Sequence, residues 1–133
     1  MFKLIRIEGS GVNVPEPHKF KKEVGIYIIA GEALNLNEGI VCGTDAEASP
    51  TLMSYAAASE EADEVLCFYV TPAMLFESKL AADTAVKAGD MMLIAEDDNA
   101  SMSLVGGIEG GHIEIVNPLG ATKRGDTVII RFI

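Results

Sequence analysis

The chain has 133 residues, a formal net charge of −10 at pH 7 and a hydrophobic share of 49%, and it contains no tryptophan. A chain of this length most simply forms one domain, and its acidity argues against binding nucleic acid, because phosphates attract clustered Lys and Arg. No apolar run approaches the roughly 18 to 20 residues of a membrane span, and the first residues lack a signal-peptide pattern. We therefore expect a protein made in the cytoplasm that binds neither nucleic acid nor membrane.

The first element in chain order is a strand over residues 2–7, which we place at a sheet edge because Glu8-Gly-Ser-Gly ends it. Segment 12–23 then holds two prolines, which forbid regular pairing and favour an extended, solvated path. Residues 1–23 are thus expected to form an edge strand and a Pro-containing arm. Residues 24–133 are expected to form a β-barrel-like body, beginning with a strand over 24–30.

Charge separates the same two parts. Residues 1–24 carry five basic and three acidic residues, a net of +2, whereas the remainder carries five basic and 17 acidic residues, a net of −12. A basic leading segment either pairs with its own acidic body or binds an acidic partner. The residues that we predict to contact such a partner are Phe2, Lys3, Leu4, Arg6, Lys19, Lys21 and Lys22.

Residues 50–64 have two possible structures. Good helix formers over 52–64 could give about three helical turns. The alternative is a hairpin, in which strands over 52–57 and 65–70 flank an acidic loop around Ser59-Glu-Glu-Ala-Asp. We favour the hairpin because residues 65–70 are a strong strand signal and most other turns of the chain are short β connections.

One short pattern occurs twice, as Lys87-Ala-Gly-Asp and Lys123-Arg-Gly-Asp, and each copy leads into an apolar run. Gly supplies the positive φ of a tight turn, and Asp can accept hydrogen bonds from nearby backbone N–H groups. The second copy also spells the integrin tripeptide Arg124-Gly-Asp, which here is part of a turn. Short strands about ten residues apart with Gly-containing turns predict a mainly β fold, a small β-barrel or sandwich of short antiparallel strands with an extended N-terminal segment.

Reactive constellations are scarce. Cys42 and Cys67 lack metal-ligand spacing, so we expect buried thiols, and the Gly-rich turn at 106–111 lacks a phosphate-binding spacing. His112 and Glu114 could be a fragment of a metal site, but the second histidine, His18, lies in the Pro-rich segment. No nucleophile motif is present. We therefore expect no enzyme, no metal and no cofactor; an enzyme using His112 and Glu114 would need both side chains in one cleft.

Four segments together resemble small proteins of phage and prophage head-gene clusters, the capsid decoration or cement proteins. They are Ala30-Gly-Glu-Ala-Leu, Val70-Thr-Pro-Ala-Met-Leu-Phe-Glu, Leu80-Ala-Ala-Asp-Thr-Ala-Val-Lys-Ala-Gly-Asp and Ile115-Val-Asn-Pro-Leu-Gly-Ala-Thr-Lys-Arg-Gly-Asp-Thr-Val. The resemblance spans residues 24–133 and implies a β-barrel-like head protein that trimerises and clamps neighbouring major capsid subunits in the virion. It implies no catalytic residue.

A second function remains open at this stage. The chain could be a small-ligand-binding β-barrel whose pocket is lined by Tyr27, Tyr55, Tyr69 and His112. A deep cavity with converging polar groups would favour this alternative, and a packed aliphatic interior would remove it.

Overall fold

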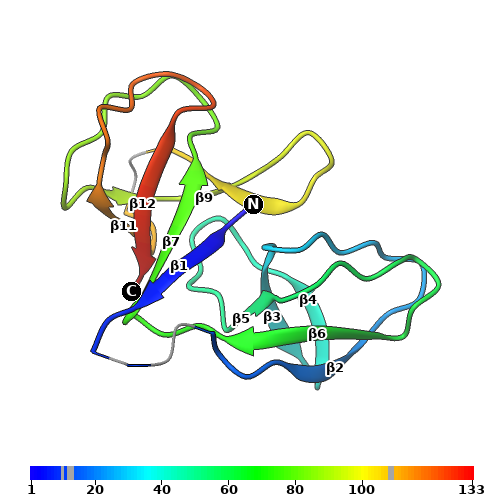
Figure 1. Ribbon diagram of the computed structural model, residues 1–133. Coiled ribbons are helices and arrows are strands. Elements are labelled where there is room, and N and C mark those ends of the chain that lie inside the picture. Colours follow the sequence, from blue (N-terminus) through cyan, green and yellow to red (C-terminus); the bar gives the residue numbers. More distant parts are fainter. Residues whose placement is uncertain (10, 12–13, 108–109) are drawn as a thin grey trace.

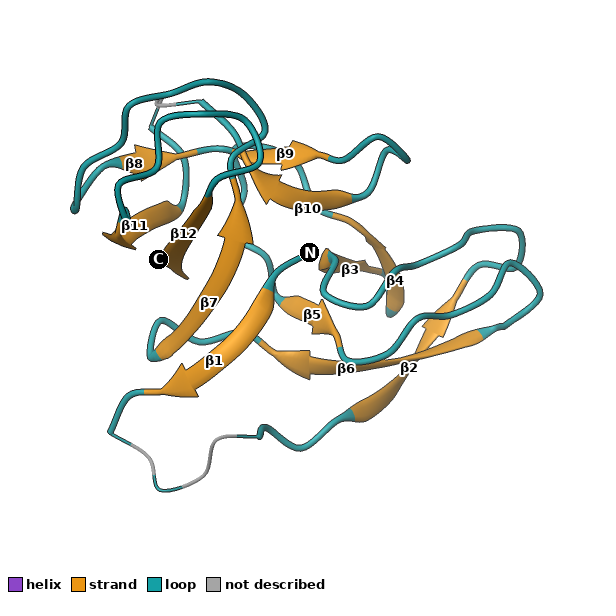
Figure 2. Ribbon diagram, turned by 45° about the horizontal axis from the view of Figure 1, so that its top comes forward, coloured by secondary structure: helices purple, strands orange, loops and turns teal. Residues whose placement is uncertain are grey.

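The computed structural model of the chain describes residues 1–9, 11, 14–107 and 110–133. The remaining residues lie in the Glu8-Gly-Ser-Gly turn, in the predicted Pro-containing segment and in the Gly-rich turn at 106–111, so these expectations fall partly outside the described residues. The described residues form twelve strands and no helix, so the prediction of a mainly β fold is confirmed (Figure 1, Figure 2). The strands are β1 (Lys3–Ile7), β2 (His18–Lys22), β3 (Ala33–Asn37), β4 (Ile40–Gly43), β5 (Leu52–Ser54), β6 (Glu64–Tyr69), β7 (Met74–Lys79), β8 (Met91–Met92), β9 (Ile94–Glu96), β10 (Met102–Val105), β11 (Ile113–Asn117) and β12 (Thr127–Phe132).

Five strands close into a barrel in the order β2-β4-β3-β5-β6. Neighbouring strands are antiparallel except for β2 and β4, which run parallel. Alternate residues of a strand point to opposite faces, so one face of each strand turns its side chains toward the barrel interior. The interior is filled by Ile28, Leu34, Val41, Leu52, Ala58, Val65 and Cys67.

The barrel forms one lobe of the protein. The other lobe is an open five-stranded sheet in the order β1-β7-β12-β11-β8, accompanied by the two-stranded sheet β10-β9. Its core contains Phe2, Phe76 and Phe132, whose rings meet edge to face with centroids 5.0 to 6.4 Å apart. Three barrel residues belong to the same hydrophobic cluster: Ala33, Met53 and Phe68. Burial of a Met or Phe side chain contributes about 1.5–3 kcal/mol. One core therefore joins the open sheet to the barrel.

The N-terminal predictions are half right. β1 is indeed an edge strand, because among the described residues it pairs only with β7. The prediction of an arm is wrong for the second part of the segment, since His18–Lys22 forms β2. This strand pairs with β6 and β4 and is part of the wall of the closed barrel. Both prolines precede this strand, and Phe20 packs against the barrel core while Lys19 and Lys21 are exposed. Residue 23 therefore does not separate an arm from a body.

The predicted strand over residues 24–30 is also wrong. This segment makes only an isolated bridge, between Ile28 and Ala58. Gly25 has a φ of +98° and turns the chain directly after β2, so the following residues leave the barrel wall. Segment 24–27 instead lies beside the acidic loop, with the Gly25 N–H donating to the Glu60 carbonyl.

The hairpin alternative for residues 50–64 is confirmed. β5 pairs antiparallel with β6 in the register Leu52 to Tyr69, Met53 to Phe68 and Ser54 to Cys67. The first strand is shorter than predicted and ends at Ser54, although the next backbone N–H, that of Tyr55, still donates to the Leu66 carbonyl of β6.

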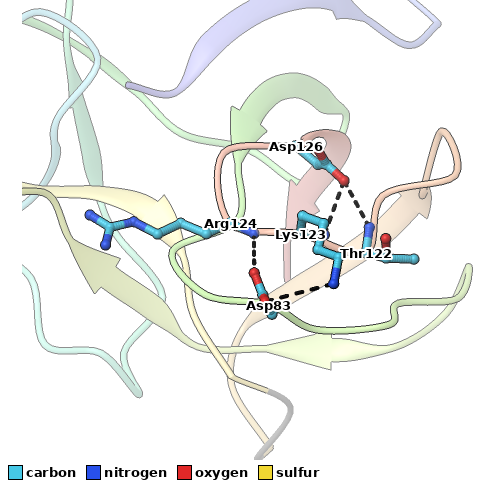
Figure 3. A network of polar contacts seen from close by, with 5 residues as sticks. All are labelled: Asp83, Thr122, Lys123, Arg124 and Asp126. Atoms are coloured by element: carbon cyan, nitrogen blue, oxygen red, sulfur yellow. Dashed lines mark hydrogen bonds and ion pairs between the residues drawn. The ribbon is translucent and has the colours of Figure 1, made fainter.

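The two Lys-x-Gly-Asp turns have the predicted geometry. Gly89 and Gly125 have φ values of +92° and +87°. The Asp90 carboxylate accepts one backbone N–H, from Lys87 at 2.8 Å. The Asp126 carboxylate accepts two, from Thr122 and Lys123 at 3.0 Å each, as Figure 3 shows.

Each turn also makes two backbone hydrogen bonds with a residue in or next to a strand of the other copy, and the pattern of bonds is the same in both. Gly89 donates to the carbonyl of Ile115 in β11, and Ile115 donates back to the Asp90 carbonyl, at 2.8 and 2.9 Å. Gly125 and Asp126 make the same two bonds with Leu80, which directly follows β7, at 2.9 and 3.0 Å. Correspondingly, β7 pairs with β12 and β11 pairs with β8. The repeated motif is therefore one strand–turn–strand unit present twice, and the two copies interlock.

Candidate docking surfaces

A groove lies beside the start of β1, where Lys3 and Leu4 face residues of the barrel lobe. Its volume is about 260 Å³, and its wall is mainly apolar, formed by Phe2, Leu4, Val14, Pro15, Tyr55 and Phe68 among others. Gly31 closes one end, because its carbonyl accepts the Phe2 N–H at 2.9 Å and a Cβ there would lie 2.6 Å from the Phe2 carbonyl oxygen. We call this feature, together with the free side of β1, the edge groove.

Basic side chains accompany the edge groove. Lys3 and Arg6 of β1 are exposed, and the ion pairs found among the described residues use other cations, namely Lys123, Arg124 and Arg131. The register of β1 against β7 shifts between Leu4 and Arg6, so Ile5 lies in a bulge and is 38% exposed. Edge strands with free backbone groups and an apolar neighbourhood are sites for strand addition.

Of the other predicted partner-binding residues, Phe2 and Leu4 line the edge groove, Lys19, Lys21 and Lys22 lie on β2, and two of the five, Phe2 and Lys22, are buried. Phe2 is a core side chain at 2% exposure. Lys22 is 4% exposed, and its Nζ donates to the carbonyls of Glu23 and Ala62 at 2.8 Å each, so it secures the end of the barrel. Leu4 packs partly against the core, whereas Lys19 and Lys21 are exposed on β2. The basic residues of segment 1–24 are thus divided between the two lobes.

A second surface lies where residues 23–27 run alongside residues 59–63, and we call it the tip. It forms the loops that project from the barrel at the right of Figure 1. Val24, Ile26 and Tyr27 are 66%, 44% and 54% exposed there. The accompanying acidic residues Glu23, Glu60, Glu61 and Asp63 are exposed as well. Sequence reasoning placed this apolar segment inside a strand and therefore missed the surface; its only signal was Gly25 directly after the barrel strand.

One buried carboxyl lies at the junction of the lobes. Glu32 is 7% exposed, and burial raises its pKa, although the Ile29 N–H, 3.3 Å from Oε1, and the Ser101 hydroxyl oppose this rise. Asp97 raises it further. The backbone N–H of Glu32 donates to the Ser54 hydroxyl at 2.9 Å. Because this group is held by its own turn and by serine hydroxyls, we assign it to the structure of the junction.

The residues considered for catalysis do not form a reactive pair. His112 is exposed, and its Nδ1 lies 2.8 Å from the Ile133 carbonyl oxygen. Glu114 accepts a hydrogen bond from Arg131 Nε at 3.1 Å, which makes it part of an ion pair across β11 and β12. No group of three His, Cys, Asp or Glu side chains suited to a metal ion occurs among the described residues.

The residues of the ligand-binding alternative are scattered. Tyr27, Tyr55 and Tyr69 are each about half exposed, at the tip, beside the edge groove and on β6, and His112 lies on the open sheet. The barrel interior is packed with aliphatic side chains. A shallow depression of about 590 Å³ lies between residues 43–46 and the β9–β10 hairpin, but it includes none of these four residues.

The cysteine prediction is right for one residue. Cys67 is fully buried, and desolvation raises the pKa of its thiol to about 12, so it stays protonated and unreactive. Cys42 is exposed on β4, where its thiol lies 3.6 Å from the Asn35 carbonyl oxygen. Cys42 was expected to be buried because it lies in an apolar run, but its side chain is on the outer face of the barrel.

The side chains of the integrin-like tripeptide make contacts within and around their own turn. Asp126 accepts two backbone hydrogen bonds, which lower the pKa of its carboxyl, and the Arg124 guanidinium lies 3.2 Å from Asp98. The Arg124 N–H donates to Asp83, which also pairs with Lys123 (Figure 3). This network serves the turn of the second repeat.

No protein-family model and no curated protein matches the chain. Among the described residues, no helix is long and apolar enough to cross a membrane. The docking surfaces are therefore the features from which a function has to be argued.

Proposed function

We propose that the protein is a non-enzymatic structural component of a phage-type head, which binds the major capsid protein in the assembled shell and stabilises it as a homo-oligomer, with three copies favoured. The expectation comes from the resemblance to capsid decoration proteins. The observation that supports it is a set of exposed surfaces suited to protein contacts: the edge strand β1, the apolar tip, and exposed cations that lie outside the ion pairs found among the described residues. Such surfaces join protein to protein.

The exposed face of β2 suits the contact with the shell. Lys19 and Lys21 alternate along this strand and are exposed on a chain of net charge −10. They would pair with acidic groups of the capsid protein, which gives orientation and a faster encounter more than raw affinity. A protein that binds many identical sites on the assembled shell, and not the free subunit, stabilises the shell by mass action.

Gene neighbourhood is the first test. Adjacent portal, protease and major capsid genes are expected, and a locus without any head gene would count against a head protein.

Co-sedimentation with shells assembled from that capsid protein is the decisive test. The protein should pellet with assembled shells and should not bind unassembled subunits. The variant with Lys19→Glu and Lys21→Glu should bind at least tenfold more weakly, whereas Lys87→Glu, an exposed lysine of the open lobe, should bind normally. Equal binding to shells by all three proteins would remove β2 as the contact, and absence of shell binding by the unmodified chain would overturn the function.

A further inference from the structure

We propose that the tip of one copy docks in the edge groove of a second copy, so that the chain assembles head to tail. This contact would supply the homo-oligomer of the proposed function and in that sense depends on it. It assigns the β1 cations to a second copy and leaves those of β2 for the shell.

The backbones of the two surfaces are complementary. β1 pairs with β7 on one side, and its other side faces the edge groove. Segment 24–27 has the composition of a strand but lies outside all three sheets, and the nearest β-bridge is the isolated one between Ile28 and Ala58. An extended segment that lies along a free sheet edge gains main-chain hydrogen bonds, and its alternate side chains supply specificity.

The apolar parts also match in size. The groove volume of about 260 Å³ corresponds to roughly nine water molecules at their share of liquid volume, which leaves room for one or two apolar side chains. The tip exposes Val24, Ile26 and Tyr27 within four residues, and contiguous exposed apolar groups of this kind mark interaction sites. Burying Ile26 or Tyr27 between Leu4 and Phe68 would remove apolar surface on both copies from water.

Charge determines which surfaces meet. Two copies paired β1 to β1 would bring the cations Lys3 and Arg6 together, and two copies paired tip to tip would bring Glu23, Glu60 and Glu61 together. Like charges opposite each other destabilise strand pairs, whereas the tip-to-groove contact places carboxylates beside cations. A contact between two different patches is heterologous, and it forms a closed ring when the rotation between copies closes.

A mixing experiment tests this geometry directly. Arg6→Glu damages the groove and leaves the tip intact, and Ile26→Asp damages the tip and leaves the groove intact. In sedimentation velocity, each variant alone should associate at least tenfold more weakly than the unmodified chain. An equimolar mixture should form one-to-one dimers and nothing larger, because the intact tip of one variant fills the intact groove of the other and the remaining surfaces are damaged.

Exchanging the charges of the tip and of β1 within one chain tests whether these two surfaces contact each other. Arg6→Glu and Glu60→Lys should each weaken association, and the double variant should recover most of it. Lys87→Glu and Leu119→Ser, which change an exposed cation and an exposed apolar residue far along the chain from both surfaces, should associate like the unmodified chain. Far-UV circular dichroism on every variant checks that the fold is retained.

Three results would overturn the head-to-tail contact: an unmodified chain that stays monomeric at high micromolar concentration, association that none of the surface variants weakens, or a mixture that fails to form dimers. The proposed function fails separately. If the chain associates head to tail but does not bind capsid shells, the proposed contact stands and the proposed function fails. If the chain binds shells as a monomer, the proposed function stands and the head-to-tail contact fails.

Discussion

The barrel and the open sheet both bury an apolar core, but they treat the edges of their strands differently. In the barrel, closure gives every strand two neighbours, so the backbone groups of the wall pair with one another, and the exposed apolar residues Val24, Ile26 and Tyr27 lie outside the wall, at the tip. In the open sheet, β1 pairs only with β7 within the described part of the chain, and its first residues line an apolar groove. The proposed docking surfaces thus lie where the chain leaves the wall of the closed barrel and where the open sheet ends.

The largest expected effect tests whether the two lobes share one core. Phe76→Ala should lower the free energy of unfolding by about 3–5 kcal/mol, because Phe76 is fully buried among side chains of both lobes. All three tyrosines lie between residues 27 and 69, so tyrosine fluorescence reports the barrel. In urea, the fluorescence and circular dichroism transitions should shift together.

Leu34→Ala is the matched change inside the barrel, expected to cost about 2–5 kcal/mol. It should likewise move both signals. If Phe76→Ala shifted circular dichroism alone and left the tyrosine transition in place, the lobes would be independent.

The next effect concerns the junction beside the edge groove. Gly31→Ala should cost at least about 2 kcal/mol, because the residue has a φ of +76° and a Cβ would lie 2.6 Å from a backbone oxygen. Gly125→Ala, with a φ of +87° and open space around its Cβ, should cost about 1 kcal/mol. Thermal unfolding of both variants measures the difference, and equal costs would mean that the close approach of Phe2 to Gly31 is easily relieved.

A smaller effect comes from the carboxyl at the same junction. Since burial raises the pKa of Glu32, its ionisation at neutral pH opposes folding, and stability should rise as pH falls from above the folded pKa toward the unfolded value of about 4.3. Glu32→Gln should therefore be at least as stable as the unmodified chain at pH 7, and this advantage should vanish near pH 4. The exposed control Glu61→Gln should change stability by less than about 0.5 kcal/mol at either pH. A strongly destabilised Glu32→Gln would mean that the charge itself is required.

The smallest effect separates the two turns of the open lobe. Asp126→Asn should destabilise more than Asp90→Asn, because the first carboxylate accepts two backbone N–H groups and the second accepts one. The lowered pKa of Asp126 means that its contribution is complete above the unfolded pKa of about 3.9 and is lost as pH falls through the folded value. The gap in melting temperature between the variants should thus shrink on acidification; a gap that is independent of pH would point to side-chain geometry and not to charge.

Local patterns in the sequence were sufficient for the turns and most strands. Gly89 and Gly125 take positive φ, Asp90 and Asp126 cap their turns, and the 52–69 hairpin forms as favoured, because each depends on neighbouring residues. The errors depend on contacts far along the chain. β2 needs β4 and β6 as partners, and the same closure leaves the apolar segment 24–27 outside the wall.

The candidate site was predictable to a similar degree. The edge position of β1 followed from its flanking residues, and Lys3 and Arg6 are exposed as a docking role requires. Phe2 and Lys22 were included because of their neighbours in the chain, but tertiary packing buries both. The tip could not be foreseen, because its residues have the composition of a core strand.

Amide hydrogen exchange, compared below and above the concentration at which the chain associates, is the most direct test of docking through unsatisfied β surfaces. New protection should appear together in β1 and in residues 23–27, with the walls of the barrel unchanged. Protection confined to another surface, such as β4 or the depression near residues 43–46, would contradict that account.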